Sequence, residues 1–251
     1  MTMVETIRVI VNQVWFCRRL LPAMLSIVAG LSLAGCALTQ GQVDISYTPA
    51  DSGEATKVTG AEAIAARITV DDERASKDIV GHKSNGFGME MAPITAGNDV
   101  PQTLQSAIGT ELKDRGFTIA NAGVPVTVML TKFDSRFQTG FWSGTAKAEV
   151  VMNVTVKDLN GGNIVYTKLI DAEGLNEGIQ IASSDNAQIA LDRALQKAMS
   201  DLFADNNFVA ALETAAKGAI PQARAAHSDR TATPPGSGST ANSQPTTAPS
   251  Q

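Results

Sequence analysis

The segment from Thr145 to Lys157 alternates between apolar and polar side chains over the length of a long strand. Because successive side chains of a strand point to opposite faces of its sheet, the alternation predicts one buried face and one solvated face. A sheet with a single covered face is typically antiparallel. Val151 is the exception on the polar face. The apolar face consists of Ala146, Ala148, Val150, Met152, Val154 and Val156.

Two neighbouring segments are the expected partners of this strand. Val124–Phe137 alternates in the same way, and Ile164–Glu173 follows the turn-rich Asp158–Asn163, which is typical of a hairpin. Three antiparallel strands are therefore predicted in succession.

The chain before Val124 gives weaker strand signals. Short strands are predicted at Val43–Tyr47 and Arg67–Val70. Ile79–Gly97 is rich in Gly and Met, so we expect a loop there with one short strand at Met89–Ile94.

Two long helices are predicted to cover the sheet. The first begins after Asn98 or Asp99, ends at Gly116, and carries apolar residues every four positions. The second runs from about Asp185 to Ala204 with a cap at Ser184 or Asp185, and a shorter helix around Phe208 follows. The expected fold is α+β: a mostly antiparallel sheet with two long helices on one face.

The N-terminus has the pattern of a lipoprotein signal peptide. Arg18 and Arg19 precede a short apolar run, which ends in Leu33-Ala34-Gly35-Cys36. The run is too short for a comfortable membrane span and suits a cleaved signal. This four-residue pattern resembles the lipobox of bacterial lipoproteins, so we expect cleavage before Cys36 and attachment of lipid to its thiol. Ala37, where an Asp would favour retention in the inner membrane, predicts the periplasmic face of the outer membrane.

These signals divide the chain into four parts. Residues 1–35 are the predicted signal peptide, and residues 36–42 a lipidated tether whose six residues reach at most roughly 20 Å. Residues 43–217 form the α+β domain. Residues 218–251 are rich in Ala, Ser, Thr, Pro and Gln, and a tail with so few large apolar residues is expected to be disordered.

The charge of the chain limits its partners. The net charge is −5, and residues 1–35 carry +2, so the mature chain carries −7. An acidic chain argues against nucleic acid and against electrostatic docking on anionic lipid. Cys17 and Cys36 are the two cysteines, so no thiol or disulfide is left for the mature domain. We expect no cofactor.

Several motifs together resemble the YajG family of bacterial lipoproteins over roughly residues 30–215. They are the lipobox, the Ile68–Asp71 segment with Arg74 and Ile79-Val80-Gly81, the Leu112–Phe117 segment, and the paired strands before the last long helix. The resemblance implies an outer-membrane lipoprotein without an established biochemical activity.

An aromatic loop is the main candidate for contact with a partner. Phe137, Phe141 and Trp142 cluster with glycines between two predicted strands. Such a loop suits a partner surface or a membrane interface. Alternatively, the three rings fold back and cap the core.

The remaining polar motifs do not form a recognisable catalytic or metal site. Asp71, Asp72 and Glu73 could act as acid and base in a hydrolase or transferase of envelope material, but a solvated strand end with Arg74 nearby is favoured. His82, expected in a loop, has no evident partners for a metal site. Ser84–Gly88 is expected to be a flexible turn rather than a phosphate loop. The expected function is therefore non-enzymatic binding of an unknown envelope protein, peptidoglycan or lipid, on a membrane anchor at Cys36.

Overall fold

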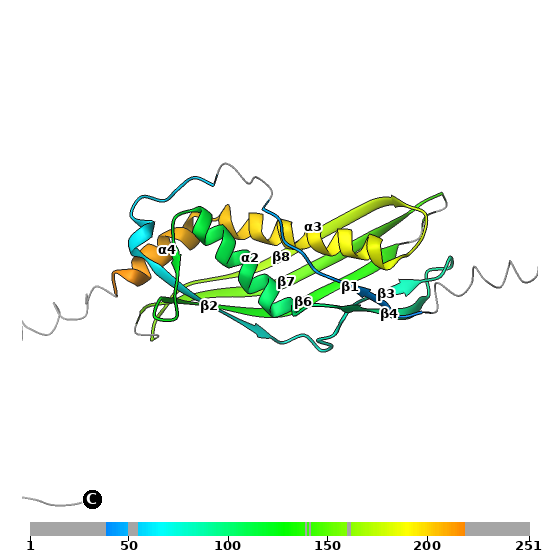
Figure 1. The fold of residues 1–251 in the computed structure, drawn as a ribbon, viewed down its shortest axis with the longest axis horizontal. Coiled ribbons are helices and arrows are strands. Elements are labelled where there is room, and N and C mark those ends of the chain that lie inside the picture. The colour runs from blue at the N-terminus through cyan, green and yellow to red at the C-terminus, as the bar shows by residue number, and fades with distance from the viewer. Residues whose placement is uncertain (1–38, 50–54, 139, 141, 160–161, 219–251) are drawn as a thin grey trace, which may run out of the picture. The chain divides into compact units, whose positions relative to one another are not determined.

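The computed structural model describes residues 39–49, 55–138, 140, 142–159 and 162–218. Within them, one sheet of eight strands is combined with three α-helices and one short 3-10 helix (Figure 1). The elements are, in order, β1 (Gly41–Val43), η1 (Ala61–Ala63), β2 (Ala65–Asp72), β3 (Ile79–Ser84), β4 (Glu90–Ala96), α2 (Val100–Asp114), β5 (Thr118–Ile119), β6 (Val124–Gln138), β7 (Gly144–Lys157), β8 (Ile164–Ile179), α3 (Ser184–Phe203) and α4 (Asn206–Ala216).

The three long strands β6, β7 and β8 form the main part of the sheet. β7 pairs antiparallel with β6 from Val156 to Thr145 and with β8 over its full length. The predicted apolar face of β7 is completely buried. The three predicted strands are thus confirmed, although β8 continues six residues beyond the expected end at Glu173.

The other edge of β6 pairs with two strands in succession. β2 lies parallel to its first half, and β3 meets it farther along, where Gly81 pairs with Ser135. β4 pairs antiparallel with β3, and β1 parallel with β4. The sheet is therefore mixed, with parallel pairing in the shorter ladders, but it is mostly antiparallel by paired residues, and the α+β class is confirmed.

β3 corrects the expected loop over residues 79–97. Val80 is fully buried, and the Ser135 Oγ donates a hydrogen bond to its carbonyl oxygen at 3.0 Å. Gly81 allows this approach, since a Cβ there would lie 2.7 Å from the Ser135 carbonyl oxygen. Gly81, one of the glycines that suggested a loop, instead permits close contact between strands.

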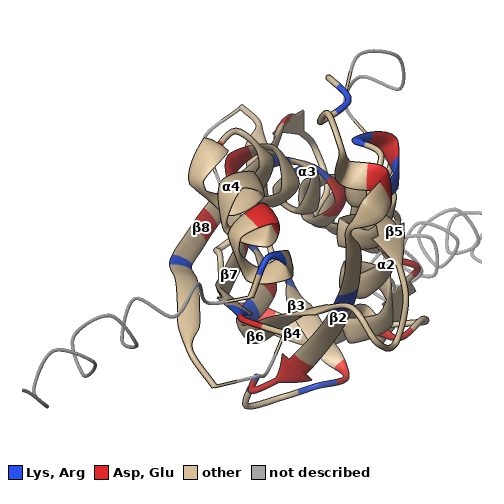
Figure 2. Cartoon of the chain, turned by 90° about the vertical axis from the view of Figure 1, so that its left-hand side faces the viewer, with Lys and Arg blue, Asp and Glu red and all other residues tan. Residues whose placement is uncertain are grey.

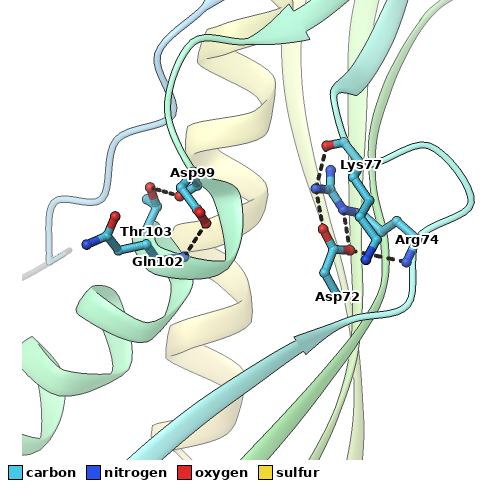
Figure 3. Close-up of polar contacts among 6 residues, drawn as sticks. All are labelled: Asp72, Arg74, Lys77, Asp99, Gln102 and Thr103. Carbon is cyan, nitrogen blue, oxygen red and sulfur yellow. Dashed lines mark hydrogen bonds and ion pairs between the residues drawn. The ribbon is translucent and has the colours of Figure 1, made fainter.

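The helices begin at side-chain caps. The Asp99 Oδ1 accepts a hydrogen bond from the Gln102 backbone N–H at 2.9 Å and so caps α2 (Figure 3). Ser183 caps α3, one residue before the expected cap, and Asp205 caps α4. Gly116, with φ of 99°, follows the end of α2 as predicted.

The two long helices lie over different parts of the sheet. α2 contacts β2 and β5, whereas α3 contacts mainly β8 and β7. Seen from the α4 end, the strands curve around the helices (Figure 2). Gly174 of β8 lets α3 approach closely, because a Cβ there would lie 2.2 Å from the Ala190 carbonyl oxygen and the Ala194 nitrogen.

The segment after β1 is extended, but it is not the strand predicted for Val43–Tyr47. Val43 and Ile45 are buried as the alternation requires. Beyond Val43, however, side chains rather than a neighbouring strand satisfy the backbone. The Asn98 side chain bonds both the N–H and the carbonyl of Ile45, and Asp192 of α3 accepts from the Ser46 N–H.

Among the described residues, no helix is both long and apolar enough to cross a membrane. The predicted signal peptide, Cys36 and the tail from residue 219 onward lie outside the described residues.

Candidate functional site

Three connections meet at one end of the sheet and line a shared cavity of about 200 Å³. They are the β3–β4 turn, the β6–β7 connection and the β8–α3 connection. The lining includes Gly86 from the β3–β4 turn, Trp142 from the β6–β7 connection and Ile181 from the β8–α3 connection. We call this region the loop end; its exposed apolar residues are Phe87, Met89, Trp142 and Ile181.

The loop end exposes large apolar side chains to an unusual degree. Phe87 is 90% exposed, Trp142 84%, Ile181 70% and Met89 58%. Single exposed apolar residues are common on protein surfaces, but clusters of them mark interaction sites. The loop end is therefore the candidate binding surface of the domain.

The β3–β4 turn is built to hold Phe87 outward. The Asn85 Oδ1 accepts hydrogen bonds from the backbone N–H groups of Phe87 and Met89, at 3.0 and 3.1 Å. Gly88 adopts φ of 80°, a conformation that side chains rarely allow. The expected turn at Ser84–Gly88 thus lies between two strands, with its apolar residue at the tip.

The predicted aromatic loop contributes only part of this surface. Trp142 is exposed as a contact residue should be, whereas Phe137 is half-buried and packs against the core. Phe141 lies outside the described residues. The role of these residues in binding a partner stays a prediction. The sequence prediction did not include Phe87, Met89 or Ile181.

The first described residues lie beside the loop end. The Lys83 Nζ donates to the Thr39 carbonyl oxygen at 2.9 Å, and Lys83 directly precedes the last residue of β3. Gly41 contacts the start of α3 so closely that a Cβ would collide with the Ser184 side chain. The polypeptide therefore enters the domain at the end that carries the exposed apolar residues.

The acidic run at the end of β2 contains a buried ion pair (Figure 3). The Arg74 Nε and Nη2 donate to the two Asp72 carboxylate oxygens at 2.9 and 2.8 Å, and Nη2 also donates to the Lys77 carbonyl oxygen at 2.7 Å. The predicted proximity of Arg74 is confirmed. The prediction of a solvated strand end is wrong for Asp72 and holds for Asp71 and Glu73, which are exposed.

The ion pair fixes the charge of Asp72. Burial raises the pKa of this carboxyl, but hydrogen bonds from the Arg74 side chain and backbone oppose burial, and the pKa lies below its ordinary value. A general acid or base needs a pKa near the working pH and access to a substrate. Asp72 instead holds the β2–β3 connection in place.

Other candidate ligands are scattered. His82 lies in β3 and not in the expected loop. Its partner in the strand register is Pro93 of β4. Within the described residues, no three His, Cys, Asp or Glu side chains gather in a group that could hold a metal ion.

A family model described as "uncharacterized lipoprotein" matches residues 53–213. The chain belongs to this lipoprotein family. The resemblance to YajG-like lipoproteins is confirmed at that level. No curated protein matches the sequence.

Solved structures similar to this lipoprotein include protein XCC0632 from Xanthomonas campestris, which is 12% identical. Its TM-score is 0.47, and the alignment covers 71% of this chain and 100% of that one. A minor lipoprotein from Acinetobacter baumannii is 10% identical with a TM-score of 0.33, covering 56% of this chain and 93% of that one. No function follows from likenesses at this level.

Proposed function

We propose that this protein is a lipoprotein anchored through Cys36 to the periplasmic face of the outer membrane, where its domain serves as a non-enzymatic binding or assembly module. The observation that carries the proposal is the lipobox Leu33–Cys36, placed directly before the domain of a lipoprotein family. Two or more acyl chains hold a protein stably on a membrane, whereas one binds reversibly. Ala37 favours the outer membrane.

Two features of the domain support binding rather than catalysis. The loop end offers a cluster of exposed apolar side chains around a shallow cavity. Asp72, the central carboxylate of the acidic run, is held in an ion pair by Arg74 with a lowered pKa, which disfavours it as a general acid. No specific observation favours the alternative of a hydrolase or transferase acting on envelope material.

The anchor is tested by intact mass and membrane fractionation of the expressed protein beside a Cys36→Ala variant. We expect the wild-type mass to fit a chain that begins at Cys36 with its acyl groups, in the outer-membrane fraction. The variant should lack the added mass and leave that fraction. An unlipidated wild-type protein in the soluble fraction would contradict the proposal, and a lipidated protein in the inner membrane would contradict its location.

A further inference from the structure

The distance between anchor and domain restricts how the domain can lie. Thr39 is three residues after Cys36, and a fully extended chain spans at most about 11 Å over three residues. Thr39 is itself held by Lys83, next to the β3–β4 turn. A lipid on Cys36 would therefore keep this turn close to the bilayer surface.

The exposed apolar residues lie at the same end as this attachment point. The β3–β4 turn begins two residues after Lys83, and its Gly86 shares the lining of the cavity with Trp142 and Ile181. Figure 1 shows β3, β4 and β1 at one end of the described domain, and α4 at the other. Tryptophan and other apolar side chains are favoured at membrane interfaces.

We infer that the loop end rests on the bilayer that holds the anchor, with Phe87, Trp142 and Ile181 in contact with its interfacial region. This inference rests on the proposed lipidation of Cys36. The mature chain is acidic, so the contact depends on apolar burial rather than on attraction to anionic headgroups. Lipidation and the apolar side chains together fix the orientation of the domain, and the α4 end points away from the membrane.

The chain contains its own probe for this contact. Its two tryptophans are Trp15, in the predicted signal peptide, and Trp142. Trp142 is thus the only tryptophan of the mature chain, and its fluorescence reports on the loop end alone.

The test uses the lipidated protein reconstituted in vesicles of phosphatidylethanolamine and phosphatidylglycerol, with ordinary or brominated phosphatidylcholine added. Bromine on the acyl chains quenches a tryptophan only when the two are in contact. We expect Trp142 emission to shift to shorter wavelength in vesicles and to lose intensity with the brominated lipid. Added salt should leave the quenching unchanged, because it screens charges and not apolar contacts.

A relocated tryptophan provides the matched control. Ile164, at the start of β8 and far from the loop end, is 61% exposed. A Trp142→Phe, Ile164→Trp variant carries its single tryptophan there, and we expect no bromine quenching. Ile181→Ser with Phe87→Ser should reduce the quenching of Trp142, whereas Ile164→Ser should not. Circular dichroism checks that each variant is folded.

The outcomes separate this inference from the proposed function. A lipidated, vesicle-bound protein whose Trp142 is not quenched would overturn the inference and leave the anchor in place. Equal quenching at positions 142 and 164 would overturn it too, because the domain would then have no fixed orientation. An unlipidated wild-type chain would overturn the proposed function and the inference with it. The mature Cys36→Ser chain, studied without lipid, tests whether the loop end binds a second copy of the chain instead. A shift of Trp142 emission that grows with protein concentration would show self-association at the loop end and overturn the inference.

Discussion

The two ends of the sheet treat their aromatic residues in opposite ways. At the loop end, Phe87 and Trp142 are almost fully exposed, whereas Phe137 packs against the core. At the α4 end, formed by the β7–β8 turn, the start of β8 and α4, the rings pack on one another. The Phe208 ring lies 5.4 Å from that of Phe203 and 5.6 Å from that of Tyr166, measured between centroids.

Polar groups at the α4 end are also satisfied within the domain. The Asp158 carboxylate accepts from the Gly162 N–H and the Asn163 side chain and closes the β7–β8 turn. The Tyr166 hydroxyl donates to Asp205, and burial together with this hydrogen bond raises the pKa of Tyr166. At the α4 end the aromatic rings therefore contribute to stability, whereas at the loop end Phe87 and Trp142 are available for contact.

The largest expected effect on stability comes from a substitution at the α4 end. Phe208→Ala removes a fully buried ring from contact with Phe203 and Tyr166. Truncation of a buried Phe costs about 3–5 kcal/mol of unfolding free energy. Urea unfolding of the mature Cys36→Ser chain, followed by circular dichroism, should show a much lower midpoint. A loss below about 1 kcal/mol would contradict the view that this cluster stabilises the domain.

The next largest effect tests whether the acidic run stabilises the fold or performs chemistry. Asp72→Asn leaves the buried Arg74 guanidinium without its charge partner, and breaking such a pair costs about 3 kcal/mol or more. The exposed neighbour provides the control, since Glu73→Gln should leave the midpoint unchanged. An Asp72→Asn variant that unfolds like the wild type would show that the pair contributes little, and would make the carboxylate a catalytic candidate again.

The pH dependence of this effect has a defined sign. The pKa of Asp72 is lower in the folded chain than its ordinary value, so its ionisation stabilises the fold above about pH 4. That contribution disappears as the pH falls through the folded pKa. The difference in unfolding free energy between wild type and Asp72→Asn should therefore be full at neutral pH and shrink in acid. A difference that grew in acid would contradict the assignment.

The regular elements were predictable because their side chains follow a single period. The alternation of β7 and the four-residue apolar period of α2 give both position and buried face, and both are confirmed. β3 was not predictable in this way, since glycine signals a loop unless the opposite strand is known.

The loop end was only partly predictable for a different reason. Trp142 stands out in its own loop, but Phe87 and Ile181 come from segments far apart in the sequence. Only strand register brings those segments together. Likewise, Asp72 and Arg74 are residue types found mostly on surfaces, and their burial follows from the packing around the β2–β3 connection.

A smaller effect is expected at the cap of α4. The Asp205 carboxylate accepts from the Asn207 N–H at 3.0 Å and from the Lys168 Nζ at 3.0 Å. Asp205→Ala should lower the unfolding free energy by about 1 kcal/mol, the usual cost of losing such a cap. Asp201→Ala, in the last turn of α3, removes only an exposed ion pair with Lys197, so it serves as the control and should change the unfolding free energy by less. Equal effects would show that Asp205 has no special role at this end.

The smallest effect on stability is expected at the loop end, and it completes the comparison. Phe87→Ser and Ile181→Ser remove side chains that are already 90% and 70% exposed, so little apolar area returns to water on unfolding. Substitutions of this kind change the unfolding free energy by about 0.5 kcal/mol or less. The same urea titration measures this. If either variant lost as much stability as Phe208→Ala, the loop end would be part of the folding core, and its exposed residues would no longer be a contact surface. If stability is kept while contact with the bilayer weakens, the two ends of the sheet have separate tasks, because the same kind of side chain stabilises the fold at one end and serves contact at the other.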